Sequence, residues 1–129
     1  MSRAKCRILY VDDHEDAAVM LQHLLSHEDY EVVVATSMAQ AKEIVRHDFF
    51  DLYVLDKRLP DGTGIELCQI LNDLTPAVPC IFYSGDAYEI HKQEALAAGA
   101  DAYIAKPDIV ALIDAVHKLL LGQECAATT

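Results

Sequence analysis

Short runs of apolar residues alternate along the chain with longer stretches in which apolar residues recur every three or four positions. The short continuous runs are typical of strands buried on both faces, and the longer spacing is typical of amphipathic helices. The pattern predicts five strands, over residues 6–11, 30–35, 51–55, 80–83 and 102–105. A helix follows each strand, so the sequence predicts an α/β protein.

Capping residues mark the limits of the predicted helices. The first helix runs from about Glu15 to Ser26. Its apolar residues, which we expect to face the core, are Ala17, Met20, Leu21, Leu24 and Leu25. Residues suited to begin the four later helices are Ser37, Thr63, Asp86 and Asp108. The third helix contains the apolar residues Ile65, Cys68, Leu71 and Leu74, and Gly99 and Gly122 are placed to end the last two helices.

The order of these elements favours one sheet topology. Right-handed crossovers place the strands in a doubly wound, five-stranded parallel sheet with order 2-1-3-4-5, between helices on both faces. The five units account for nearly the whole chain, so we expect a single domain over residues 1–129, with its core at about 5–121 and a tail at 122–129.

Polar residues stand where the predicted strands end. Asp12 and Asp13 follow the first strand, Asp56 follows the third, and Ser84 and Lys106 follow the fourth and fifth. Because the carboxyl ends of parallel strands lie at one edge of the sheet, all five should converge there. Two like charges about 4 Å apart repel by roughly 4 kcal/mol at an effective dielectric near 20. A cation must compensate, either Lys106 or a divalent ion, and hard oxygen ligands favour Mg2+.

Composition excludes several classes of function. The formal net charge of -11, from 10 Lys and Arg against 21 Asp and Glu, predicts no direct binding to nucleic acid and none to anionic membranes. The chain has neither an apolar run near the ~18 residues of a membrane span nor a signal peptide, so we expect a cytoplasmic protein. We interpret Cys6, Cys68 and Cys80 as small apolar residues rather than disulfide partners or metal ligands, and the six histidines as surface or boundary residues.

Four motifs together resemble a known family. They are Asp12-Asp13, the stretch from Asp56 to Gly62, Ser84-Gly85 and Lys106-Pro107. Their joint spacing, over about residues 5–121, is similar to that of the receiver (phosphoacceptor) domain of two-component response regulators. The resemblance implies a flavodoxin-like fold and a phosphorylation-dependent signalling switch in a two-component phosphorelay.

The resemblance also implies roles for single residues. Asp56 would accept a phosphoryl group from a histidine kinase or a histidine phosphotransfer protein, with Mg2+ as cofactor. Asp13, Asp56 and the backbone carbonyl of Arg58 would ligate the ion, with Asp12 acting largely through bound water. Lys106 and Ser84 would stabilise the incoming charge. The chain would assist only its own phosphorylation and dephosphorylation, and so would not be an enzyme acting on a separate substrate.

The family's switch maps onto two positions. The Ser84 hydroxyl would move toward the phosphoryl group and Tyr103 would rotate inward, which changes the surface of the fourth helix, fifth strand and fifth helix. A downstream protein or a fused output domain would read that surface, and a dimer could form through it. The bond between Lys106 and Pro107 resembles a cis peptide of the family.

Some positions depart from commoner family patterns. His14 follows the acidic pair where another acid is frequent. Arg58 and Asp86 occupy positions that in the family tune the access of hydrolytic water. We hypothesise that they form an ion pair across the mouth of the pocket and slow loss of the phosphoryl group.

Two other functions fit the architecture less well. A flavodoxin-like redox protein needs a Ser, Thr or Gly-rich phosphate cradle after the first strand, where this chain has Asp-Asp-His-Glu-Asp. A small Mg-dependent phosphatase using an aspartyl phosphate needs a second acid two residues after the nucleophile, where Arg58 stands. The sequence leaves open whether the receiver is freestanding or part of a larger regulator or hybrid kinase.

Overall fold

The computed structural model describes residues 6–85 and 89–121. Five parallel strands form one sheet in the order β2-β1-β3-β6-β7. Their bounds are β1 Cys6–Val11, β2 Tyr30–Ala35, β3 Leu52–Leu55, β6 Cys80–Ser84 and β7 Ala102–Ala105. Since β6 and β7 are the fourth and fifth strands of this sheet in chain order, the predicted order 2-1-3-4-5 is confirmed.

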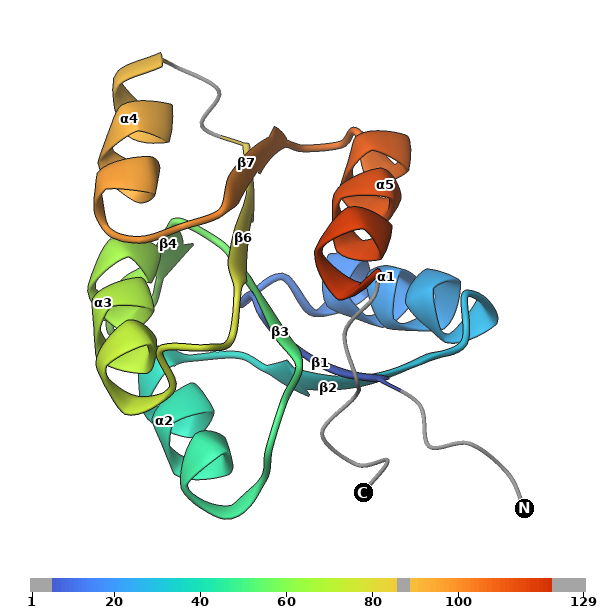
Figure 1. Cartoon of the computed structure of the whole chain (residues 1–129), viewed down its shortest axis with the longest axis horizontal. Helices are drawn as coiled ribbons and strands as arrows, with labels where there is room; N and C mark the ends of the chain where they lie inside the picture. The colour runs from blue at the N-terminus through green and yellow to red at the C-terminus, as the bar shows by residue number, and fades with distance from the viewer. Residues whose placement is uncertain (1–5, 86–88, 122–129) are drawn as a thin grey trace.

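Helices cover both faces of the sheet (Figure 1). α1 and α5 lie on one side, and α2, α3 and α4 lie on the other. Their bounds are α1 Glu15–His27, α2 Met38–His47, α3 Gly64–Leu74, α4 Glu89–Ala97 and α5 Ile109–Leu120. Within the described ranges, no helix combines the length and apolar character needed to cross a membrane.

Each central strand supplies both hydrophobic layers. In β1, Ile8 and Tyr10 pack in the layer with α1 and α5, whereas Leu9 and Val11 pack in the opposite layer. All four side chains are fully buried. Successive side chains of a strand point to opposite faces, so the middle of a strand covered on both faces takes apolar residues, and polar residues such as Arg7 and Asp12 stand near its two ends. The continuous apolar runs are therefore explained, and the first polar side chains appear at the strand ends.

The predicted caps hold wherever the structure describes them. The side chains of Ser37, Thr63 and Asp108 accept hydrogen bonds from backbone N–H groups at the starts of α2, α3 and α5. Gly99 ends the α4 segment with a φ of 110°, a conformation that favours glycine. The predicted cap at Asp86 and the predicted stop at Gly122 lie outside the described residues.

Two expectations about local structure were wrong. Met20 is 62% exposed. The buried stripe of α1 includes Leu21, and consecutive helix residues lie about 100° apart around the axis, so Met20 turns outward. Cys6 is disulfide-bonded, whereas Cys68 and Cys80 are buried free thiols as predicted.

The loop after β3 also contains a small element that the sequence did not predict. Arg58–Leu59 (β4) and Gly62–Thr63 (β5) pair as a two-stranded antiparallel sheet. This hairpin connects Asp56 to the start of α3, and thereby sets the path of the chain immediately after the site.

Candidate functional site

The backbone at the carboxyl edge of the sheet is held by bonds that continue the strand ladders. The N–H of Asp12 donates to Ala35 O at 3.0 Å, and the N–H of Asp56 donates to Val11 O at 2.9 Å. The N–H of Lys106 donates to Ser84 O at 2.9 Å. The three residues are therefore placed by the rigid sheet rather than by mobile loops.

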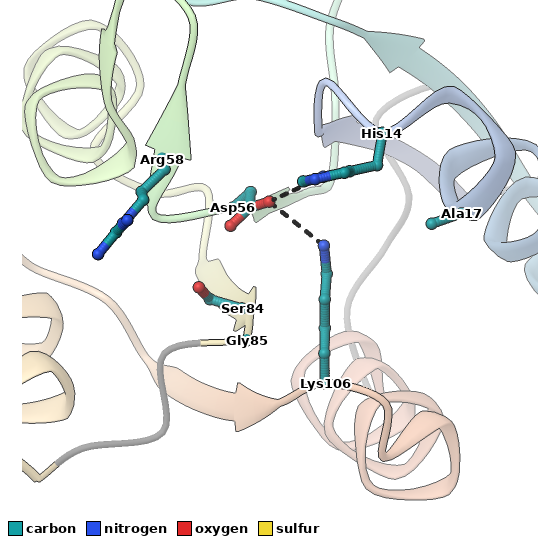
Figure 2. A pocket seen from close by; sticks show the side chains of 7 residues that line it. All are labelled: His14, Ala17, Asp56, Arg58, Ser84, Gly85 and Lys106. Atoms are coloured by element: carbon teal, nitrogen blue, oxygen red, sulfur yellow. Dashed lines mark hydrogen bonds and ion pairs between the residues drawn. The ribbon is translucent and has the colours of Figure 1, made fainter.

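A pocket of about 430 Å³ opens at this edge (Figure 2). Its lining residues are His14, Ala17, Asp56, Arg58, Ser84, Gly85 and Lys106. Asp56, Ser84 and Lys106 come from the carboxyl ends of β3, β6 and β7, whereas His14 and Ala17 come from the start of α1 and Arg58 from β4. Asp12 and Asp13 lie beside the pocket, where they contact Lys106 and His14, so the predicted convergence is confirmed.

Lys106 bridges two buried carboxylates. Its Nζ lies 2.6 Å from Asp12 Oδ2 and 3.2 Å from Asp56 Oδ2. Burial alone would lower the pKa of Lys106, but the hydrogen bond to Asp12 and the charge of Asp56 outweigh burial and raise it. The ammonium therefore stays charged between the two acids.

The two carboxylates differ in how well the protein compensates them. Burial disfavours charge on Asp12, yet hydrogen bonds from Lys106, Tyr10 and His14 outweigh burial and lower its pKa. Burial raises the pKa of Asp56, and although Lys106 opposes this effect, the charge of Asp12 adds to it. Asp12 is therefore stabilised as a carboxylate, whereas the negative charge of Asp56 is only partly compensated by its neighbours.

One member of the cluster was missed by sequence reasoning. The Tyr10 hydroxyl, fully buried, donates to Asp12 Oδ2 at 2.5 Å. A signal existed, because residues two apart on a strand share a face and Tyr10 is two residues before Asp12. The sequence analysis noted that His14 follows the acidic pair and interpreted it as a surface or boundary residue, and the structure adds its contacts with the acids.

The His14 side chain is 68% exposed, but its ring points toward Asp56 (Figure 2). Its Nδ1 lies 2.8 Å from Asp12 Oδ1, 3.3 Å from Asp13 Oδ1 and 3.7 Å from Asp56 Oδ2. The hydrogen bond to Asp12 raises the pKa of His14. The neighbouring carboxylates therefore stabilise a proton on this imidazole.

Asp12, Asp13, His14 and Asp56 fit a divalent cation. Each offers one ligand atom, and these atoms lie within 4.8 Å of one another. Both Asp12 oxygens already accept hydrogen bonds from the protein, from Tyr10, Lys106 and His14. Asp13 and Asp56 are the acids with the most capacity left for direct ligation.

The remaining predicted residues lie around the pocket. Ser84 is 3% exposed, and burial raises the pKa of Asp56 while the nearby Ser84 hydroxyl acts in the opposite direction. The ring of Tyr103 stacks on Phe82, with centroids 6.1 Å apart and planes 8° apart. The peptide bond between Lys106 and Pro107 is cis. Arg58 lines the pocket, but the ion pair hypothesised for it involves Asp86, which lies outside the described residues.

Comparison with known proteins agrees with this geometry. The family model of the response regulator receiver domain matches residues 8–117. The uncharacterized transcriptional regulatory protein YrkP of Bacillus subtilis is 38% identical over 101 residues, which cover 78% of this chain and 43% of that protein. The chain therefore spans less than half the length of this relative.

Solved structures share the fold. The CheY-like response regulator receiver domain protein of Methanospirillum hungatei is 34% identical, with a TM-score of 0.82, over 89% of this chain and 94% of that one. The response regulator TrrA of Thermotoga maritima, solved in complex with Mg2+ and BeF, is 28% identical, with a TM-score of 0.81, over 89% of this chain and 99% of that one. With the family model matched over most of its length, the chain belongs to the response regulator receiver domain family.

Proposed function

We propose that this receiver domain is a phosphorylation-dependent switch of a two-component phosphorelay, and that Asp56 accepts the phosphoryl group. The donor would be a histidine kinase or a histidine phosphotransfer protein. The observation that carries this proposal is the placement of Asp56 in the pocket, between the ammonium of Lys106 and the hydroxyl of Ser84.

Phosphoryl transfer to Asp56 would require only a few groups. An oxygen of Asp56 attacks phosphorus in line, a P–O bond forms, and the P–N bond to the donor imidazole breaks with its electron pair going to nitrogen. Negative charge spreads over the three equatorial phosphoryl oxygens during this step. Lys106 and Ser84 are placed to bind those oxygens. The product is an acyl phosphate, and the domain would assist only its own phosphorylation and dephosphorylation.

The acidic cluster supports Mg2+ as the cofactor. Asp13, Asp56 and the backbone carbonyl of Arg58 would ligate the ion, and Asp12 would act through bound water because its oxygens are already hydrogen-bonded. A bound Mg2+ supplies positive charge to the phosphoryl oxygens. The structure of TrrA with Mg2+ and BeF supports the same cofactor in this family.

The switch would run from Ser84 to Tyr103. Movement of the Ser84 hydroxyl toward the phosphoryl group would open space that the Tyr103 ring enters, at the expense of its stacking on Phe82. The surface of α4, β7 and α5 would then change, and a downstream protein, a fused output domain or a second copy would bind it. YrkP, which is longer than this chain and named a transcriptional regulatory protein, supports a fused output domain.

The lifetime of the phosphorylated state would depend on Arg58 and Asp86. We retain the hypothesis that their charges pair across the pocket and restrict water. A double-mutant cycle with Arg58→Ala and Asp86→Ala on the dephosphorylation rate should show coupling, and purely additive effects would reject the pair.

Intact-mass analysis after incubation with acetyl phosphate and Mg2+ tests the acceptor. The wild type should gain one phosphate, and Asp56→Asn should gain none. Asp61→Asn is the matched control, because it removes a nearby exposed acid, and it should be phosphorylated like the wild type. A wild type that gains no phosphate, or an Asp56→Asn protein that still gains one, would refute the assignment.

A further inference from the structure

We infer that His23 and His27, on the outer face of α1, form a two-imidazole site for a first-row transition-metal ion of tetrahedral coordination, such as Zn2+. The site lies apart from the acidic cluster, because α1 carries its axis about 13 Å from His14 before it reaches His23. The inference therefore stands independently of the proposed function.

The helix places both imidazoles on one exposed face. The buried residues of α1 are Ala18, Leu21 and Leu25, which mark the face toward the sheet. His23 and His27 are exposed, and residues four positions apart lie one turn apart on the same face of a helix. Two histidines with this spacing on one helix face can hold a single zinc ion.

The distance between the two Nε2 atoms fits one shared ion. Two nitrogens about 2.0–2.1 Å from the same zinc ion are about 3.3 Å apart at the tetrahedral angle and about 2.9 Å apart at a right angle. The Nε2 atoms of His23 and His27 are 3.3 Å apart, whereas their ring centroids are 4.7 Å apart. The rings thus turn their Nε2 atoms toward each other, at the spacing of a tetrahedral site.

No carboxylate has to be displaced for an ion to bind. Among the residues that the structure describes, each of the two rings makes its polar contact with the other, whereas the His47 ring is paired with Glu43. Without an ion, one Nε2 atom carries the proton of this contact. A neutral imidazole has two tautomers, so that proton can move to Nδ1 of the same ring and leave both Nε2 lone pairs for the metal.

The surroundings favour a cation. His27 is the last residue of α1, where the carbonyl groups of the final turn give the helix end a partial negative charge. The chain also has a formal net charge of -11. Imidazole ligands favour Zn2+ over Mg2+, which prefers oxygen ligands. Water would fill the positions that the two histidines leave open, so the ion would exchange readily.

A Zn2+ titration of the full chain, followed by NMR of the histidine side chains, tests the site because it reports on each imidazole separately. The His23 and His27 signals should respond together with one dissociation constant, and both bound rings should carry their proton on Nδ1. His23→Gln should weaken binding at His27 by about tenfold or more, since even the loss of an outer-shell partner costs about 10–100-fold. His47→Gln removes an exposed histidine of α2 and should change the constant by less than about twofold.

Separate dissociation constants for the two histidines, or a His27 signal that responds equally in the wild type and in His23→Gln, would overturn the inference, because each imidazole would then bind alone. No response of either signal at millimolar Zn2+ would also overturn it. Zinc bound at the acidic cluster would be seen in the His14 signal and is thereby distinguished from this site. A wild type that shows the coupled response but gains no phosphate would refute the proposed function and leave this inference standing.

Discussion

Aspartates lie at both edges of the sheet, and the two edges use them differently. At the amino edge, the N–H of Asp51 donates to Arg7 O at 2.7 Å and its Oδ2 accepts from the Arg7 N–H at 2.8 Å. Asp101 makes the same pair of bonds with Cys80, at 2.8 and 3.0 Å. At the carboxyl edge, Asp12 and Asp56 instead share one ammonium.

The difference teaches what makes an acid available for chemistry. A carboxylate that clamps a neighbouring backbone N–H is part of the sheet, and its hydrogen bond would be lost if it bound a ligand. Two carboxylates that face one another repel. A cation that binds between them, such as the counter-ion of a phosphoryl group, therefore stabilises both charges. The position at a strand end is common to both edges, and the type of partner separates acids that are bonded to the sheet backbone from acids that share a counter-ion.

The largest expected effect comes from removal of the Lys106 ammonium that the two carboxylates share. Lys106→Met should lower the free energy of unfolding by about 3–5 kcal/mol, because it leaves two buried charges without their partner. Urea denaturation at neutral pH in the presence of a chelator measures this loss. Addition of Mg2+ should restore part of it, since a bound ion replaces the missing charge.

Lys118→Met is the matched control, because Lys118 is an exposed residue of α5. Its free energy of unfolding should change by less than about 0.5 kcal/mol. A Lys106→Met protein as stable as the Lys118→Met protein would show that the carboxylates do not need the ammonium.

The second test moves the backbone of the reactive edge. A Cβ atom at Gly64 would lie 2.1 Å from the carbonyl oxygen of Asp56 and 3.0 Å from Phe82 Cε2. Gly64→Ala should therefore cost about 1–3 kcal/mol of stability, and it should slow phosphorylation by displacing Asp56. Thermal melting and the rate of phosphate incorporation measure the two effects.

Gly85→Ala provides the control for overpacking. A Cβ atom there would meet nothing within 4 Å, although Gly85 also lies at the carboxyl edge. Its melting temperature should stay close to that of the wild type. Equal losses in both variants would mean that glycine flexibility, rather than the contact with Asp56, explains the effect.

The third test predicts that removal of an acid changes stability in opposite directions at the two edges of the sheet. Asp51→Ala should destabilise by about 1–3 kcal/mol, because the Arg7 N–H loses its acceptor in a part-buried position. Asp56→Asn should instead raise the melting temperature in chelator by a few degrees, because it removes a buried, partly compensated charge.

The direction of the pKa shift of Asp56 also determines how the effect of Asp56→Asn on stability depends on pH. Burial, with a contribution from Asp12, raises the pKa of Asp56 above the usual 3.8 even though Lys106 opposes the shift. A group with a raised pKa contributes its full stability below its usual pKa and loses it as the pH rises. The gain from Asp56→Asn should therefore be present at pH 7 and shrink toward about pH 4. A gain that grows on acidification would contradict the assignment.

The sequence predicted the elements that local patterns determine. Strand ends follow from where an apolar run stops, and the parallel topology then brings Asp12, Asp56 and Lys106 to one edge without further information. Side-chain directions were harder. Met20 and Leu21 are neighbours in sequence, and only packing of the whole helix against the sheet decides which one is buried.

The site itself was predicted as a set of residues but not as a network. The bond from Tyr10 to Asp12 depends on a rotamer that aims a buried phenol along its strand, and the position of the His14 ring depends on a backbone that forgoes capping. Both details arise from three-dimensional packing around Asp12. They determine which acids remain free to bind, which composition and spacing do not encode.

The smallest expected effect concerns an acid near the reactive edge that has structural partners. Asp61, in the β4–β5 turn, accepts from the N–H groups of Ala39 and Met38 at 2.9 and 2.8 Å, and these bonds lower its pKa. A lowered pKa contributes stability above the usual value and loses it as the pH falls. Asp61→Ala should slightly lower the melting temperature at pH 7, by less than Asp51→Ala, and the difference from the wild type should vanish on acidification.

Ser37→Ala is the control, because it removes a neutral cap from α2, the helix whose first N–H groups Asp61 binds. Its loss of about 1 kcal/mol of stability should persist at low pH. Identical pH profiles for the two variants would mean that the charge of Asp61 adds nothing to its hydrogen bonds, and that partner type alone does not separate structural from reactive acids.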